Sequence, residues 1–127
     1  MKLGYTLLYV NDVEIAMDFY SKAFGLERGF LSDEKQYGEM VTGETKLGFV
    51  HHETAMGHDF EYEKVTPNKT APGIEIAFLA TDVKAAFDKA VKGGAKPVSE
   101  PKTKPWGQTV SYVRDCNGFL VEICSPM

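Results

Sequence analysis

The feature that most constrains the fold is an internal repeat. Residues 5–20 return seventy positions later as residues 75–90, and in both copies an apolar run meets Asp-Val and continues as a helical pattern. Asn11 or Asp12 in the first copy and Asp82 in the second are the expected helix caps. A repeat at this long spacing is not that of a solenoid. It predicts two similar halves that pack on each other.

The first half is expected to run strand, helix and three strands. In residues 3–10, Leu8 and Val10 share one strand face, while Tyr5, Leu7 and Tyr9 share the other. Both faces are apolar, which predicts a strand covered on both sides. The other expected elements are a helix over 13–24, a strand, turn and strand within 26–41, and a strand over 46–50.

The second half repeats this order after a segment with no clear period, residues 51–73, which we interpret as a linker. The pattern predicts one domain, 1–127, made of a module over 1–50, the linker, and a module over 74–127. Within the second module we expect a strand over 74–80, a helix from 83, a short edge strand near 96–98, a Pro-rich loop over 100–107, and strands over 108–114 and 119–124.

Charge and composition exclude several partners. The net charge of −4 argues against nucleic acid, and no apolar run reaches the roughly 18 residues of a membrane span. The N-terminus resembles a strand, not a signal peptide, so we expect a cytoplasmic protein. Cys116 and Cys124 are then expected to be free thiols, with no basis for a thiolate nucleophile.

The opening and closing motifs resemble a known family. Leu8-Tyr9-Val10 with Asp12, together with the closing run from Val113 to Ile123, resembles the vicinal oxygen chelate superfamily, which includes glyoxalase I, bleomycin-resistance proteins and extradiol dioxygenases. The resemblance implies an α+β fold in which two βαβββ modules form a curled-sheet cup. It also implies a homodimer and a concave face that binds a small molecule.

The resemblance further implies four positions for metal ligands, on the first and last strands of each half. This sequence places Tyr5, Gly48, Glu75 and Glu122 there, so only Glu122 matches the usual ligand type. Gly48 has no side chain to ligate, and no position supplies the imidazole that Zn²⁺ or Ni²⁺ prefers. Glu75 and Glu122 could hold a hard divalent ion with waters, or one of them would take up a proton.

Other residues leave alternatives open. We expect Tyr5, Glu75, Glu122 and Trp106 to contact a ligand. Arg114 faces away from Glu122 if the turn spans residues 115–118, and toward the cavity if the register slips by one residue. Phe49 is expected in the core on the helix side. The linker histidines, His51, His52 and His58, are expected to be solvated loop residues.

Two functions remain open from the sequence. The first is a small-molecule binding protein without the usual metal site, with an aromatic and acidic cavity suited to a cationic or polyhydroxylated ligand. The second is a glyoxalase-like lyase or isomerase that uses one divalent metal ion at Glu75 and Glu122, with Glu122 as the catalytic carboxylate. No cofactor is expected in the first case.

Overall fold

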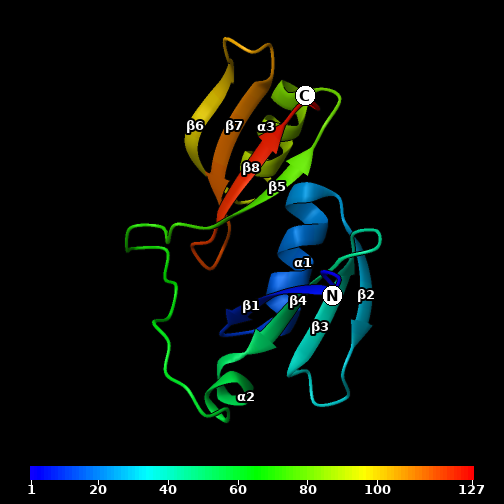
Figure 1. The fold of residues 1–127 in the computed structure, drawn as a ribbon, viewed down its shortest axis with the longest axis vertical. Helices are drawn as coiled ribbons and strands as arrows, with labels where there is room; N and C mark the ends of the chain where they lie inside the picture. The colour runs from blue at the N-terminus through cyan, green and yellow to red at the C-terminus, as the bar shows by residue number, and fades with distance from the viewer. The chain divides into compact units, whose positions relative to one another are not determined.

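The repeat in the sequence is a repeat in the fold. A computed structural model describes all residues, 1–127, and its chain divides into two compact units, Met1–Lys64 and Val65–Met127, called unit 1 and unit 2 (Figure 1). Asp12 and Asp82 hold equivalent places, because the carboxylate of each accepts a 3.0 Å hydrogen bond from the backbone N–H three residues later.

Unit 1 contains one four-stranded sheet, sheet 1, in the order β1-β4-β3-β2, with β1 and β4 parallel and the other neighbours antiparallel. Its elements are β1 (Tyr5–Val10), α1 (Val13–Phe24), β2 (Glu27–Leu31), β3 (Tyr37–Val41), β4 (Lys46–His51) and α2 (His52–Met56). The first five confirm the predicted strand, helix and three strands. Helix α2 was not predicted, because five residues are too few to show a helical period.

Unit 2 contains the matching sheet, sheet 2, in the order β5-β8-β7-β6, again with the first pair parallel. Its elements are β5 (Glu75–Leu79), α3 (Val83–Lys92), β6 (Lys96–Thr103), β7 (Thr109–Arg114) and β8 (Leu120–Cys124). The expected loop over 100–107 is partly wrong, since β6 continues to Thr103. Its prolines, Pro97 and Pro101, are tolerated because β6 is an edge strand with two irregularities in its register.

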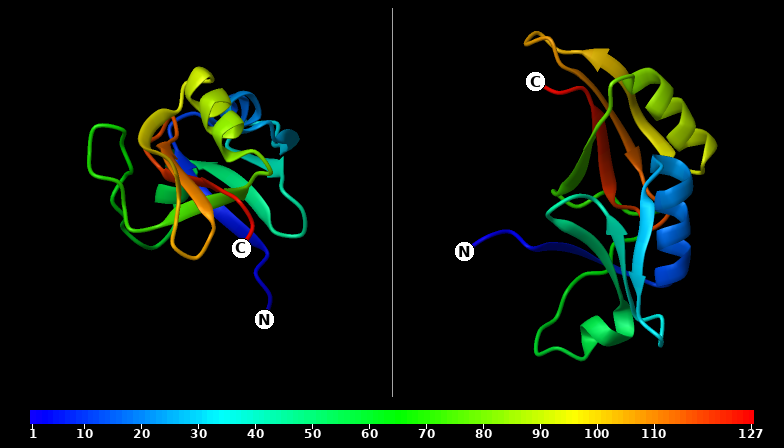
Figure 2. Two further views of the ribbon diagram at one scale, coloured as in Figure 1. Left: turned by 90° about the horizontal axis from the view of Figure 1, so that it is seen from above. Right: turned by 90° about the vertical axis from the view of Figure 1, so that its right-hand side faces the viewer.

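Helices α1 and α3 each cover one face of the sheet in their own unit (Figure 2). In unit 1 the buried core lies between α1 and sheet 1, and Phe49 is fully buried there, with its ring centroid 5.1 Å from that of Tyr20. This confirms the core prediction for Phe49. No helix is long and apolar enough to cross a membrane.

The face of sheet 1 opposite α1 is called the open face. It carries Tyr5, Leu7 and Tyr9 from β1, as the alternation predicts. Tyr5 and Leu7 are 57% and 42% exposed, so the expectation that this strand is covered on both sides is wrong at its N-terminal end. Tyr9 is covered, because the ring of Tyr62 packs edge-on against it at 4.9 Å.

Candidate functional site

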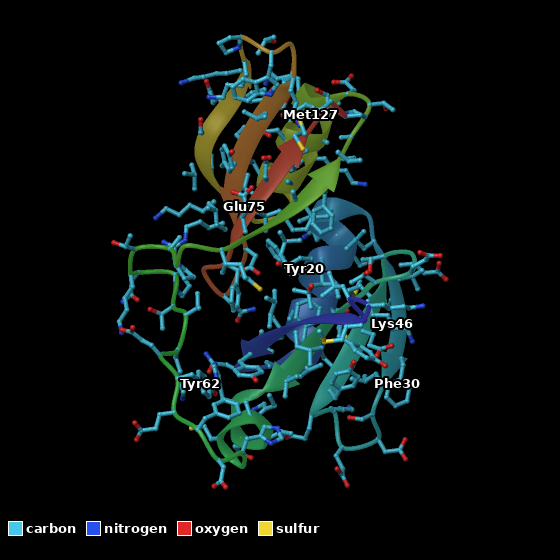
Figure 3. All side chains as sticks on the ribbon, in the orientation of Figure 1. Tyr20, Phe30, Lys46, Tyr62, Glu75 and Met127 are labelled. Carbon is cyan, nitrogen blue, oxygen red and sulfur yellow. The ribbon has the colours of Figure 1, made fainter.

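A pocket of 640 Å³ lies on the open face of sheet 1. All four strands of the sheet contribute to it, because alternate residues of a strand point to the same face. The lining residues are Tyr5, Leu7, Phe30, Tyr37, Glu39 and Lys46. Figure 3 labels two of them, Phe30 and Lys46. A pocket of this volume is large enough for a one- or two-ring organic molecule.

The polar floor of the pocket is a carboxylate with two partners. Glu39 is 8% exposed; Tyr37 donates a 2.5 Å hydrogen bond to its Oε2, and Lys46 Nζ lies 3.2 Å from its Oε1. The Tyr37 hydrogen bond, aided by Lys46, holds the pKa of Glu39 below its ordinary value, although burial opposes this. Burial and the same hydrogen bond raise the pKa of Tyr37. At neutral pH Glu39 is therefore ionised and Tyr37 is neutral.

The space beside Gly48 is already filled. A Cβ atom at Gly48 would lie 2.8 Å from Leu7 Cδ2, 3.2 Å from the Gly38 carbonyl oxygen and 3.2 Å from the Tyr37 hydroxyl. Side-chain atoms of Leu7 and Tyr37 thus take the volume that a ligating side chain at position 48 would need. This crowding gives a physical reason for glycine here, beyond the absence of a ligand.

Unit 2 brings Glu75 and Glu122 to one face of sheet 2. Glu75 pairs with Leu120 and Ala77 pairs with Glu122 in the parallel ladder, so both carboxylates point to the same side. Burial first, and then the neighbouring Glu122, raises the pKa of Glu75. Tyr112 Oη lies 3.4 Å from Glu122 Oε1. The two carboxylates therefore share one face of sheet 2, where Glu122 acts on Glu75.

The four positions implied for metal ligands do not fit that role within either unit. Neither unit gathers three or more His, Cys, Asp or Glu side chains that could hold an ion. In unit 1, Tyr5 offers only an exposed phenol, and Gly48 is crowded by its neighbours. In unit 2, Glu75 and Glu122 are two ligands, which a hard cation would have to complete with waters.

Arg114 lies on the Glu122 side of sheet 2, because it pairs with Leu120 and not with Phe119. The β7–β8 turn is one residue longer than the four-residue turn, with the Asp115 N–H bonded to the Phe119 carbonyl. The slipped register is therefore the correct one of the two alternatives. The guanidinium donates hydrogen bonds to four backbone carbonyl oxygens. The donor–acceptor distances are 2.9 Å to Gly118, 3.2 Å to Pro67, 2.6 Å to Lys69 and 3.1 Å to Thr66.

Trp106 lies apart from the carboxylate pair, whereas Cys124 lies beside Glu122. Trp106 is 63% exposed in the β6–β7 turn, and its indole N–H donates to Gln108 Oε1 at 3.0 Å. The register places Glu75 at the opposite end of sheet 2. Both cysteines are free, and burial raises the pKa of Cys116 to about 12 and that of Cys124 above its ordinary value. Neither thiol is poised as a nucleophile.

The expectation of solvated linker histidines is wrong for His52. His52 is 4% exposed, its Nδ1 lies 2.6 Å from the Tyr62 hydroxyl, and the two rings stack. Burial, with help from nearby Lys64 and His51, lowers the pKa of His52. The linker therefore begins as a segment tied to the open face of sheet 1, with Tyr62 lying near α2 (Figure 3).

Sequence reasoning missed most of the pocket in unit 1. Tyr5 was expected to contact a ligand, but Leu7, Phe30, Tyr37, Glu39 and Lys46 were not. One signal was present: Tyr37 and Glu39 alternate within one strand and must share a face. Lys46 gave no signal, because only the parallel pairing of β1 with β4 places it beside Tyr5.

Comparisons with known proteins agree with this architecture. The family described as Glyoxalase/Bleomycin resistance protein/Dioxygenase superfamily matches residues 2–123. The Bacillus subtilis (strain 168) protein called Uncharacterized protein YraH is 30% identical over 124 residues, which cover 97% of each chain.

Two solved structures share the fold. One is a glyoxalase-related enzyme from Fulvimarina pelagi, with a TM-score of 0.82 and 18% identity over 99% of this chain and 88% of the other. The second is a glyoxalase/bleomycin resistance protein/dioxygenase family enzyme from Burkholderia phytofirmans PsJN, with a TM-score of 0.78 and 17% identity over the full length of both chains. At these identities the likeness extends to the fold alone.

Proposed function

This chain belongs to the Glyoxalase/Bleomycin resistance protein/Dioxygenase superfamily, and we propose that it binds a small organic molecule on the open face of sheet 1 without the metal site usual in the enzymes it resembles. The observation that carries this proposal is the 640 Å³ pocket bounded by Tyr5, Phe30 and Tyr37. Exposed aromatic and aliphatic side chains around a few fixed polar groups are typical of small-molecule sites.

The donor set supports a metal-free site. Tyr37 and Leu7 fill the volume beside Gly48, and the only cation built into the pocket is Lys46. The alternative is a metal-dependent lyase or isomerase in which Glu75 and Glu122 hold one divalent ion, with Glu122 as its catalytic carboxylate. The shared face of these two carboxylates favours that alternative, although two side chains leave most of the coordination to water.

Binding is tested by a thermal-shift screen of a diverse library of small organic molecules, since a ligand of the native state raises its melting temperature. Each compound that raises it is re-measured with Phe30→Ala and with Ile15→Ala. Both residues are 60% exposed, but only Phe30 lines the pocket. The proposal expects Phe30→Ala to weaken binding and Ile15→Ala to leave it unchanged. A library without a single binder, or binders indifferent to Phe30→Ala, would contradict it.

Metal dependence is tested on protein purified without chelator. Elemental analysis is expected to find no stoichiometric divalent ion, and ligand binding is expected to persist in EDTA. One ion per chain that is lost in Glu122→Gln would instead establish the metal-dependent alternative.

We also propose an assembly and a location for the protein. The exposed apolar side chain of Leu79 in unit 2 supports a homodimer that covers it. Light scattering on the eluting protein is expected to give twice the mass of 14.1 kDa. A cytoplasmic location and a lack of nucleic-acid partners remain predictions from the sequence.

A further inference from the structure

The pocket on sheet 1 combines an apolar wall with one accessible charge. Phe30 and Tyr37 form an open aromatic corner, with ring centroids 6.3 Å apart and ring planes inclined by 44°. Phe30 and Tyr5 are 60% and 57% exposed. A flat ring system placed between them would remove this apolar surface from water.

The carboxylate of the pocket is already engaged. Glu39 is 8% exposed, and each of its carboxylate oxygens has a partner in the protein, Tyr37 for one and Lys46 for the other. Because the hydrogen of the Tyr37 hydroxyl points to Glu39, it is not free for a ligand. A ligand that offers only donors would therefore find no accessible carboxylate in this pocket.

Lys46 is the member of the ion pair that still has hydrogens to donate. An ammonium group has three N–H donors and no acceptor, and Glu39 uses one of them. The Lys46 side chain is 52% exposed, so the remaining donors can reach a molecule in the pocket. Among the lining residues, Glu39 and Lys46 alone form an ion pair. Of the two, the exposed partner is the cation Lys46.

We propose that the pocket on sheet 1 selects a planar aromatic molecule that carries an acidic oxygen group, such as a carboxylate or a phenolate, with the ring against Phe30 and Tyr5 and the anion on Lys46. This inference rests on the proposed function, since it names the ligand class of the same site. It departs from the cationic or polyhydroxylated ligand expected from the sequence, because Glu75 and Glu122 belong to unit 2 and do not line this pocket.

The test uses three molecules that share one ring system: 2-naphthoate, 2-naphthamide and 2-naphthylmethylammonium. Calorimetric titration of the full chain at pH 7 is expected to show the acid binding about tenfold more tightly than the amide, because a charge-assisted hydrogen bond is stronger than a neutral one. The ammonium compound is expected to bind most weakly. The preference for the acid should also shrink as salt is raised, since the site is open to solvent.

Variants assign the preference to Lys46. Lys46→Met would leave Glu39 without its cation, so the cleaner variant combines Lys46→Met with Glu39→Gln, which removes both charges. In that variant the acid and the amide are expected to bind equally, whereas Lys46→Arg keeps the preference. Lys22→Met, on the exposed side of α1, is the control and should change nothing.

Three outcomes overturn the inference. If the amide or the ammonium compound binds the unmodified protein as tightly as the acid, the ligand class is wrong while the proposed binding function stands. If the acid preference survives the double substitution, Lys46 is not its origin. If none of the three molecules binds, the inference falls, and the library screen decides separately whether the proposed function falls with it.

Discussion

The Tyr37 hydroxyl lies 3.2 Å from the position that a Cβ atom on Gly48 would occupy, and the same hydroxyl donates a 2.5 Å hydrogen bond to Glu39. At position 48 the family resemblance implies a ligating carboxylate. In this protein the Tyr37 hydroxyl occupies the space beside that position. In the ladder of unit 2, the position equivalent to Gly48 is Glu122, which faces Tyr112 across the same antiparallel pair. The two halves have kept one topology and diverged at these positions.

Substitution of Gly48 by alanine is expected to destabilise the fold. The added Cβ would displace Leu7 Cδ2 and press on the Gly38 carbonyl, and such overpacking costs about 1 to 3 kcal/mol. Urea unfolding of Gly48→Ala measures the loss. Adding Leu7→Ala should recover part of it, because the closest contact disappears. If Gly48→Ala is as stable as the unmodified protein, the neighbours of Gly48 can move aside at no cost, and the prediction is wrong.

Glu39→Gln is expected to lower the free energy of unfolding at pH 7 by about 1 kcal/mol or more. A typical lost hydrogen bond costs about that much, and one to a charged group costs more. The folded state holds the pKa of Glu39 below its ordinary value of 4.5. This contribution is present above pH 4.5 and is lost as the pH falls toward the lower folded-state value. The gap between the two proteins should therefore close in acid.

Unfolding free energies at several pH values between about 3 and 7 measure this gap. Glu44→Gln is a control, because Glu44 lies in the β3–β4 turn and has no charged partner in the ladder. A gap that stays constant across this range would mean that the hydrogen bonds of Glu39 do not depend on its charge.

Glu75→Gln is expected to behave in the opposite way. Burial and Glu122 raise the pKa of Glu75 above its ordinary value of 4.5, so the folded state binds more protons than the unfolded state just above that pH. Stability then decreases as the pH rises through the folded-state value. Glu75→Gln should remove this decrease and be most favourable, relative to the unmodified protein, at pH 7. The same pH series in Glu122→Gln should show a smaller decrease, since one source of the shift is gone.

Tyr62→Phe is expected to loosen the linker where it meets the open face of sheet 1. The Tyr62 hydroxyl is 2.6 Å from Nδ1 of the buried His52, and its removal leaves that nitrogen without a partner. Hydrogen exchange in residues 52–62 should accelerate, while exchange in β7 and β8 stays unchanged. Equal exchange in both regions would contradict a local role.

The same contact should depend on pH. The pKa of His52 lies below its ordinary value of 6.5, so its contribution to stability is present above pH 6.5 and is lost as the pH falls toward the folded-state value. Faster exchange in residues 52–62 is therefore expected in mild acid. His52→Asn should show no such step.

Arg114→Gln is expected to cost about 2 kcal/mol, because hydrogen bonds from a charged group contribute roughly 1.5 to 3 kcal/mol and the guanidinium serves four carbonyls in the native state. Gly118→Ala should act at the same place, since its φ of 98° favours glycine and a Cβ would lie 2.7 Å from the Thr66 carbonyl. Both variants should expose residues 66–69 to proteolysis. Lys104→Gln, on the β6–β7 turn, is the control.

The sequence by itself determined the architecture of this protein. Asp12 and Asp82 begin equivalent helices, and the alternation in β1 assigns Leu8 and Val10 to the core and Tyr5 to the opposite face. These predictions succeeded because caps and strand periodicity act over a few neighbouring residues. The equivalence of the two halves followed from the repeat, without any contact being known.

Only the tertiary structure decided the composition of the pocket. Lys46, Glu39 and Phe30 come from three strands, and their meeting depends on ladder registers that no local pattern encodes. The same reason explains Arg114, where one extra residue in a turn reversed the direction of the side chain, and His52, whose ring stacks on that of Tyr62 ten residues away. Register and long-range packing have no short-range signature, since their energies arise between residues far apart in the chain.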